Sequence, residues 1–164
     1  MRKLGVLVAA CVLLGLTATP AGAAPFTSGR YTAWGDGRLE LRGTGLCLDA
    51  ALEEIDVEGG RVQLWTCGLG GDEQKWTPVS HGRGTLLVNR LNGKCLDAAL
   101  EEIDLEGGRV QMWTCGLGGD EQLWTFDSHQ GDVFIDSRAT NGKLGVGRLD
   151  DLHSGAPVGV WHKR

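Results

Sequence analysis

The chain has 164 residues, of which 16 are basic and 21 acidic, and a formal net charge of −5 at pH 7. An acidic chain is repelled by the phosphates of nucleic acids and by anionic membrane surfaces, so we expect no nucleic-acid partner and no membrane insertion. The length suits a single domain with a short leader.

The N-terminus has the pattern of a secretory leader. Arg2 and Lys3 precede an apolar run over residues 4–16, and the small residues Ala21-Gly22-Ala23 follow it. The run is too short to cross a bilayer, whereas the three parts together are typical of a signal peptide. We predict a signal peptide at 1–23, a domain at 24–164, and secretion from the cell.

A repeat with a period of 48 residues dominates the rest of the chain. Residues 47–76 and 95–124 differ at three of thirty positions. A third, weaker copy is indicated by Asn141-Gly142-Lys143, one residue out of step with an earlier Asn-Gly-Lys, and by Val158-x-x-Trp161. Repeated units bury their apolar faces against one another, so the period predicts three stacked units, at about 29–76, 77–124 and 125–164.

The local pattern predicts an all-β fold. Short apolar runs such as 86–88 and 133–135 lie between Gly, Asn and Asp residues, and no stretch keeps a helical period for three turns. The 27 glycines fit many turns. Three units of about four strands each can close into a barrel, which leaves few exposed strand edges.

Four cysteines remain after the leader, which predicts two disulfides in a secreted protein. Three pairings are possible, and the repeat favours Cys47 with Cys67 and Cys95 with Cys115, because each copy then contains the same bridge. Zinc is the rival interpretation, but its sites usually need closely spaced cysteine pairs. In the third unit, Leu144 and Lys163 stand at the cysteine positions.

These motifs resemble a known family. Cys-Leu-Asp-Ala, Val-Gln-Leu-Trp-Thr-Cys and Gln-x-Trp occur in this order in the first unit and nearly unchanged in the second. The combination resembles the ricin-type lectin domain, a threefold β-trefoil that binds sugars, and the likeness extends from about 38 to 161. It implies a saccharide-binding protein without a cofactor, which we expect to be a monomer.

Residue by residue, the resemblance implies two carbohydrate sites, formed by Asp49, Gln63, Trp65, Glu73 and Gln74 and by Asp97, Gln111, Trp113, Glu121 and Gln122. In the family, the Asp and the first Gln bind hydroxyls, the aromatic ring stacks on the sugar, and the last Gln supports the Asp. Glu73 and Glu121 stand where the family often has Asn. A carboxylate cannot donate a hydrogen bond, so we expect a shifted sugar preference or a lost contact.

Each of these assignments has an alternative. Trp65 and its repeat can pack on the neighbouring disulfide instead of on a sugar, and Asp49 and its repeat can bond turn backbone. The Trp of each Gln-x-Trp, Trp76 and Trp124, is expected in the core. The third unit has Val146 at the Asp position and Gly159 at the Gln position, so we expect at most two working sites.

The third unit stops before a final Gln-x-Trp strand. Counting back one period places residues 26–32 at the missing strand, and a turn at 35–37 would lead into 39–41. We therefore predict that the N-terminal segment closes the barrel.

The loop between the Asp and the Trp is acidic in both copies. Glu54, Asp56 and Glu58 alternate as calcium ligands do, yet the twelfth position of a loop that starts at Glu54 is Trp65, where a bidentate Glu is needed. A solvated acidic rim is favoured over a metal site, and such a rim would suit amino sugars or other cationic ligands.

No recognisable nucleophile motif is present, and adjacent acids such as Glu53 and Glu54 lack the different environments that acid–base catalysis needs, so we expect no enzyme. Two other functions stay open: a trefoil protease inhibitor, and a calcium-binding or protein-interaction domain that has lost sugar binding.

Overall fold

The computed structural model describes residues 29–162; the predicted signal peptide lies outside this part of the chain. The described residues form short strands and four single-turn 3₁₀ helices, which confirms the all-β class. The strands are β1 (Tyr31–Ala33), β2 (Leu39–Leu41), β3 (Leu46–Ala50), β4 (Gly60–Thr66), β5 (Trp76–His81), β6 (Gly84–Asn89), β7 (Cys95–Ala98), β8 (Gly108–Trp113), β9 (Trp124–His129), β10 (Asp132–Ser137), β11 (Lys143–Gly145), β12 (Ala156–Pro157) and β13 (Gly159–Trp161). Within residues 29–162, no helix is long and apolar enough to cross a bilayer.

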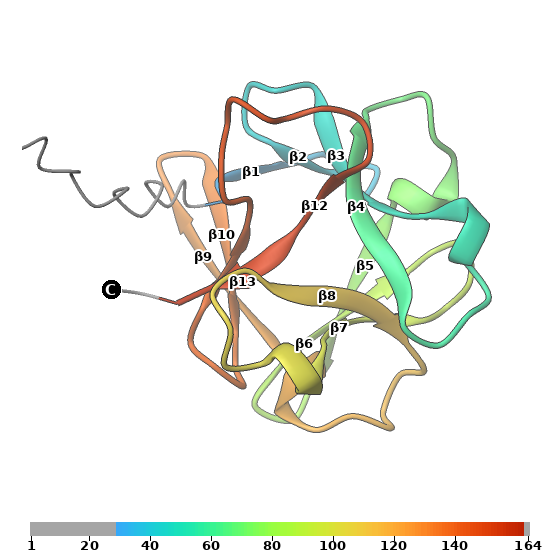
Figure 1. Ribbon diagram of the computed structural model, residues 1–164, viewed down its shortest axis with the longest axis vertical. Coiled ribbons are helices and arrows are strands. Elements are labelled where there is room, and N and C mark those ends of the chain that lie inside the picture. Colours follow the sequence, from blue (N-terminus) through green and yellow to red (C-terminus); the bar gives the residue numbers. More distant parts are fainter. Residues whose placement is uncertain (1–28, 163–164) are drawn as a thin grey trace, which may run out of the picture.

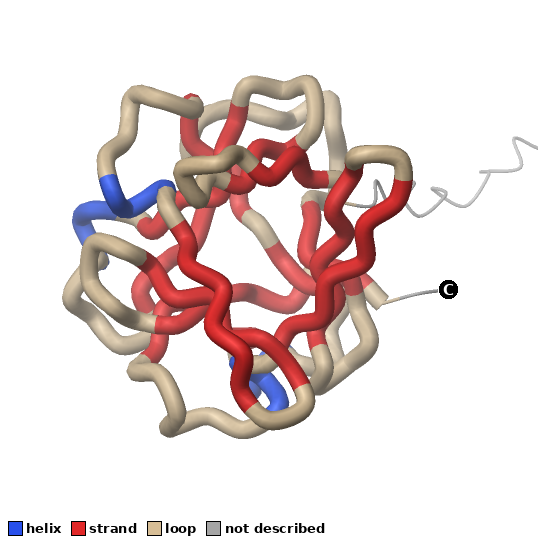
Figure 2. Tube along the Cα trace, turned by 180° about the vertical axis from the view of Figure 1, so that it is seen from behind, coloured by secondary structure: helices blue, strands red, loops and turns tan. Residues whose placement is uncertain are grey.

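The three units are arranged around a pseudo-threefold axis, which lies near the centre of Figure 1. At one end of the barrel, β4 pairs with β8, β8 with β13, and β12 with β4, so each unit is joined to the next in a closed ring. The antiparallel hairpins β1–β2, β5–β6 and β9–β10 come from the three successive units. Figure 2 shows the strands surrounding a common centre, with loops and helices outside them.

Apolar side chains fill this centre. Because side chains alternate between the two faces of a strand, Leu48 and Leu96 point inward from β3 and β7 while their neighbours point outward. Trp76 and Trp124 are almost fully buried, and each indole Nε1 donates to a backbone oxygen at 3.0 Å, that of Leu48 and that of Leu96. The prediction that these two tryptophans belong to the core is confirmed.

β1 takes the place of the fourth strand of the third unit. Tyr31 pairs with Val133 of β10. In the β1–β2 hairpin, Tyr31 is the first residue of the first strand and faces Leu41; Trp76 and Trp124 are the first residues of the other two hairpins. The Tyr31 side chain is fully buried in the same core. The predicted turn from β1 into β2 is present, and residues 26–28 lie outside the described part of the chain.

The position of β1 differs from the prediction by three residues. Counting by the period puts residue 28 at the tryptophan position, whereas the hairpin pairing puts Tyr31 there. The core needs a large ring at this point, and Tyr31 is the aromatic residue that the strand pairing brings to it.

The register of the third unit also differs from the prediction. Lys143 faces Trp161 as Cys95 faces Trp113, so Lys143, and not Leu144, occupies the first cysteine position. The Asn-Gly-Lys motif is misleading because Asn141 takes the place of Gly93 in the turn. Both residues have a positive φ, 57° and 71°, and Asn is one of the few side chains that tolerates this conformation.

Both predicted disulfides are present. Cys47 bonds to Cys67 and Cys95 to Cys115, each with a sequence separation of 20 residues and a Cα–Cα distance of 5.0 Å. Each bridge closes a loop that carries the Asp, the first Gln and the exposed-position Trp of its own unit, while the Glu and the last Gln follow the second cysteine. A disulfide that closes a loop of this length is expected to stabilise the fold by about 3 kcal/mol, because it lowers the entropy of the unfolded chain.

Replacing Tyr31 with Ala should lower the free energy of unfolding by about 3–5 kcal/mol, because it removes a buried ring from the core and weakens the strand that completes the barrel. Chemical denaturation followed by tryptophan fluorescence measures this.

Tyr31→Phe is the matched control. Among the described residues, the buried hydroxyl has no hydrogen-bond partner, so its removal should change stability by no more than about 1 kcal/mol or increase it. Equal losses in the two variants would contradict a packing role for the ring.

Candidate functional site

The first candidate site is centred on a buried aspartate. Asp49 on β3 lies directly opposite Gln63 on β4, and the Gln63 Nε2 donates to Asp49 Oδ1 at 3.0 Å. Gln74 Nε2 donates to the second oxygen, Oδ2, at 3.2 Å. Only 4% of Asp49 is exposed. Its carboxylate therefore accepts from side-chain amides, and the alternative that it serves a turn backbone is not supported.

Gln74 is held by the loop that it closes. It lies in the 3₁₀ helix η2 (Asp72–Gln74), where its Nε2 also donates to the Thr66 oxygen at 3.1 Å and its Oε1 accepts from the Gly68 N–H at 3.3 Å. The residue is fully buried. Gln74 thus fixes the orientation of the Asp49 carboxylate without reaching the surface itself.

A pocket of about 140 Å³ opens in front of Asp49. It is lined by Asp49, Leu52, Glu53, Gln63, Trp65, Leu69, Gly70 and Glu73. Trp65 is 39% exposed, so part of its ring is available for stacking. Four of the predicted site residues of this unit line the pocket, and Gln74 lies behind it.

The sequence reasoning missed the two leucines at the rim. Leu52 and Leu69 are 57% and 78% exposed, although both are large and apolar. Both recur one period later, as Leu100 and Leu117, and these are equally exposed. The recurrence of both leucines in polar, glycine-rich loops was the signal available in the sequence.

The electrostatics of the pocket disfavour ionisation of its central acid. Burial raises the pKa of Asp49, and the nearby carboxylates of Glu73 and Glu53 raise it further. The amides of Gln63 and Gln74 act in the opposite direction by bonding the charged form. The net effect is a raised pKa for Asp49, because burial and the neighbouring acids outweigh the two amide hydrogen bonds.

Glu73, which departs from the family pattern, lines the pocket and is 6% exposed. Its Oε1 accepts a hydrogen bond of 2.7 Å from the Gly71 N–H. The glutamate therefore shapes the glycine loop beside the pocket and also contributes a charge to it. Glu121 makes the same bond to the Gly119 N–H, at 2.6 Å.

The second unit repeats the arrangement. Gln111 Nε2 donates to Asp97 Oδ1 at 2.8 Å, Asp97 is 4% exposed, and burial again raises the pKa of its carboxyl. Gln122 is fully buried and bonds the Thr114 oxygen at 3.1 Å. One difference is that Arg109 Nη1 donates to Gln111 Oε1 at 2.7 Å. The second difference is a half-buried ring at Trp113, where the first unit has an exposed one.

The third unit has no counterpart of the Asp–Gln pair. Gly145 faces Gly159 at the position where Asp97 faces Gln111, so the Asp position is Gly145 and not Val146 as the sequence suggested. The error comes from the displaced Asn-Gly-Lys motif. Two glycines offer no side-chain hydrogen bond, which leaves the third unit without the polar groups of the other two.

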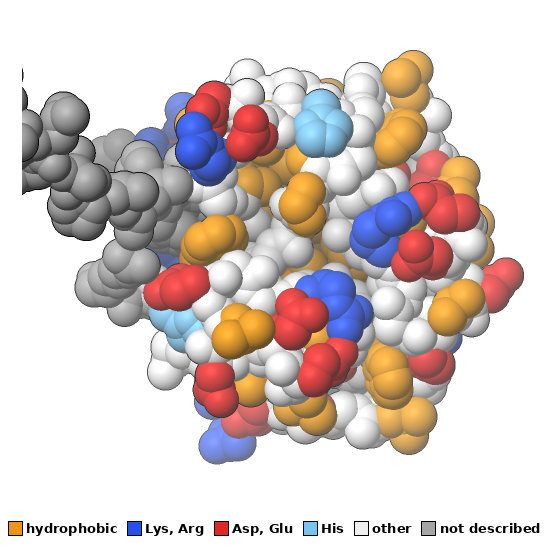
Figure 3. Space-filling view, in the orientation of Figure 1, with side chains coloured by type: hydrophobic (Ala, Val, Ile, Leu, Met, Phe, Trp, Pro, Cys, Tyr) orange, Lys and Arg blue, Asp and Glu red, His pale blue; other side chains and the backbone are white. Residues whose placement is uncertain are grey.

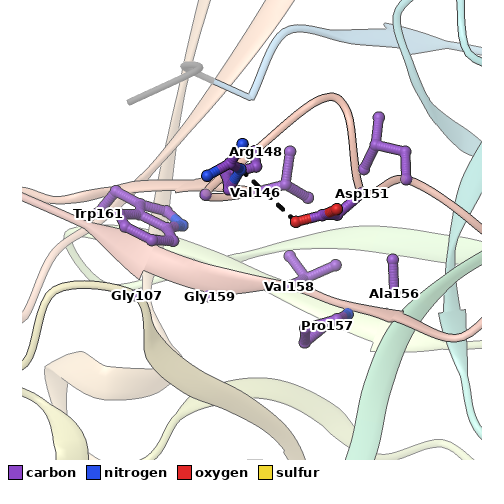
Figure 4. Close-up of a pocket in the computed structure, with 11 residues that line it drawn as sticks. Gly107, Val146, Arg148, Asp151, Ala156, Pro157, Val158, Gly159 and Trp161 are labelled. Carbon is purple, nitrogen blue, oxygen red and sulfur yellow. Dashed lines mark ion pairs between the residues drawn. The ribbon is translucent and has the colours of Figure 1, made fainter. Parts of the chain in front are cut away.

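A different pocket, of about 440 Å³, occupies this part of the third unit. Figure 4 shows Trp161 at one end and Ala156 at the other, with Pro157 and Val158 along one side. An ion pair between Arg148 and Asp151 lies along the opposite side. The lining is largely apolar and has lost the hydrogen-bonding pattern of the first two sites.

Contacts within the protein occupy most of the acidic loop side chains. Glu54 accepts from the Arg61 N–H at 2.9 Å, and Glu58 accepts from the Thr114 N–H of the next unit at 2.8 Å and pairs with Lys94. Acidic and basic side chains lie side by side on the face shown in Figure 3. Within the described residues, no three His, Cys, Asp or Glu side chains are grouped to hold a metal ion.

The loop contacts repeat around the axis and join the units. Glu106 accepts from the His162 N–H at 3.2 Å, one period after Glu58 and Thr114. In the third loop, the Ser154 hydroxyl accepts from the Thr66 N–H at 3.1 Å. The acidic loop of each site therefore also has a structural role, which the sequence did not indicate.

The comparison with known families agrees with this geometry. The family described as the ricin-type beta-trefoil lectin domain matches residues 30–162. The chain belongs to this family. A search of curated proteins found no significant match.

Solved structures show the same fold. A designed threefold symmetric protein, ThreeFoil, is 28% identical with a TM-score of 0.68, and the match covers 83% of this chain and 91% of that one. An exo-beta-1,3-galactanase from Clostridium thermocellum is also 28% identical, with a TM-score of 0.65; the match covers 85% of this chain and 28% of the galactanase. The ricin B-like lectin of Macrolepiota procera, in complex with lactose, is 20% identical with a TM-score of 0.60, covering 85% and 91%.

Replacing Gly159 with Ala should destabilise this ricin-type domain by about 1–3 kcal/mol, because a Cβ at Gly159 would lie 2.4 Å from the Gly107 oxygen. The same crowding should prevent a Gln at this position from restoring the third site. Thermal unfolding measures the effect. Gly35→Ala is the control, since no atom lies within 4 Å of its added Cβ; similar losses in both variants would refute the steric explanation.

Proposed function

We propose that this protein is a secreted lectin that binds saccharides at two near-identical sites, one in each of the first two units. The observation that carries the proposal is the Asp49–Gln63 pair beside an exposed Trp65 ring in a small pocket. The second unit repeats the Asp–Gln pair as Asp97 and Gln111. The ricin-type family to which the chain belongs supports it.

The chemistry of the pocket suits a sugar ring. A saccharide presents hydroxyls in a fixed array and an apolar face of C–H groups, so a site needs hydrogen-bonding groups and an aromatic plate. Each Asp49 oxygen accepts one amide hydrogen and keeps capacity to accept from a sugar hydroxyl. Trp65 offers its partly exposed ring to the C–H face. Gln74 would keep the carboxylate oriented during binding.

A similar structure supports the binding of a saccharide, and the predicted leader supports secretion. The Macrolepiota procera lectin of the same fold was solved with lactose. Secretion is supported by the predicted signal peptide and by two disulfides, which persist mainly in oxidising compartments. We propose binding without a catalytic step. Contacts within the protein occupy Glu54 and Glu58, which disfavours the calcium alternative.

Replacing both Asp49 and Asp97 with Ala should abolish binding to any saccharide found on a glycan array, because each site loses the acceptor at its centre. Each single variant should halve the number of sugars bound per chain. Calorimetry measures both the affinity and the stoichiometry, and the initial array is run with and without calcium.

Asp127→Ala is the matched control, since Asp127 is exposed on β9 and lies outside both sites. It should bind like the wild type. An array without hits in either condition would refute the lectin proposal, and undiminished binding by the double variant would refute the assignment of the sites.

Binding of a neutral saccharide should weaken as the pH falls. Burial raises the pKa of Asp49 and of Asp97, and in the first site Glu73 and Glu53 add to this shift. A protonated carboxyl group loses part of its capacity to accept hydrogen bonds, so the loss should begin at a higher pH than for an exposed aspartate. Affinities measured from about pH 7 to about pH 4 test this; a constant affinity over that range would contradict it.

A further inference from the structure

We propose that the two sites prefer saccharides that carry a protonated amino group, such as hexosamines that are not N-acetylated. This inference rests on the proposed function and names the ligand class of the same sites. It is carried by the arrangement of charge around the first pocket, where three of the eight lining residues are carboxylates and none is Lys or Arg.

Arg61 neutralises only one of the three carboxylates that line the pocket. Arg61 pairs with Glu53 and with Glu54 on the outer side of the loop. Asp49 and Glu73 form no ion pair within the described residues, and they are 4% and 6% exposed. Two carboxylates thus face one small pocket without a cation from the protein.

The hydrogen-bond partners of these two acids are neutral. Asp49 accepts from the amides of Gln63 and Gln74, and Glu73 accepts from the Gly71 N–H. A buried charge is costly unless a counter-charge or several hydrogen bonds compensate it. A ligand that brings a positive charge would compensate both carboxylates with a counter-charge, whereas a neutral sugar can offer them only hydrogen bonds.

The carboxylate of Glu73 also selects by hydrogen-bond direction. A carboxylate only accepts, whereas an ammonium group offers three donors and no acceptor. An N-acetyl group offers a single N–H donor together with a carbonyl oxygen, and that oxygen would be repelled by the acids. The exposed ring of Trp65 adds a surface that attracts cations.

The second site repeats the acids, but Glu121 is half-buried where Glu73 is buried, and one contact differs. Asp97 and Glu121 keep their positions, and Arg109 pairs with Glu101 and Glu102. In this unit, however, the Arg109 guanidinium also donates to Gln111, next to Asp97. The Arg109 charge is thus linked to Asp97 through Gln111, a link that is not seen between Arg61 and Asp49 among the described residues of the first site. The preference for an amine should therefore be weaker at the second site.

The test compares galactosamine with N-acetylgalactosamine, and glucosamine with N-acetylglucosamine, by ligand-observed NMR at about pH 6, where the amines are protonated. We expect at least one of the two amino sugars to bind about fivefold or more tightly than its N-acetyl form at low salt. This is the ratio that one unit charge at about 4 Å gives even in a water-like medium. The ratio should decrease in about 0.5 M salt.

The double variant Glu73→Gln and Glu121→Gln isolates the charge. Gln has nearly the same shape and keeps an oxygen that can accept from the glycine N–H, so the loop should stay folded, and circular dichroism checks this. The ratio should fall below about twofold in this variant. Asp127→Asn, which removes an exposed charge from β9 outside both sites, should leave the ratio unchanged.

The outcomes separate this inference from the function on which it rests. Equal or tighter binding of the N-acetyl sugars in both pairs would overturn the amine preference and leave the lectin proposal in place. A ratio that survives in the double variant would overturn the assignment of the preference to the charge of the two glutamates. Failure of every sugar on the glycan array would remove the lectin proposal and this inference together.

Discussion

The pairing of β3 with β4 is the constraint on which the rest of the site depends. In this register Cys47 faces Trp65 and Asp49 faces Gln63, while Leu48 between them points into the core. The alternation of side chains along a strand therefore puts the disulfide, the acid and the amide on one face. The disulfide ties the start of β3 to the end of β4, and Gln74 reaches back from the glycine loop that follows to the second oxygen of Asp49.

The three units have the same scaffold but differ in chemistry. All three contribute a hairpin, a buried ring and a loop contact to the next unit, because the closed barrel requires these from each third of the chain. The Asp–Gln pair is not required for closure. The third unit has Gly145 and Gly159 in its place and still pairs in the same register.

The acids of the first unit fall into two groups, those that line the pocket and those that bond the scaffold. Asp49 and Glu73 are nearly buried acids whose hydrogen-bond partners are neutral, and a buried charge without a counter-charge is costly. The outer acids differ from them, since Glu54 and Glu58 bond backbone and side chains of the scaffold. One acidic loop thus serves both the fold and the pocket.

The repeat in the sequence predicted three all-β units with one disulfide in each of the first two, because near-identical copies must adopt near-identical structures. The trefoil itself came from the resemblance of the motifs to the ricin-type family, and the burial of Trp76 and Trp124 agrees with it. The same resemblance placed Asp49 and Gln63 in one site, and the structure pairs them. Where the copies diverge, matching the sequences was misleading. The displaced Asn-Gly-Lys motif shifted the predicted register of the third unit by one residue, and the period put the core aromatic position three residues before Tyr31. Only the tertiary structure decided these positions, since backbone pairing, the turn conformation at Asn141 and the volume of the core determine the register, and none of them depends on matching sequence.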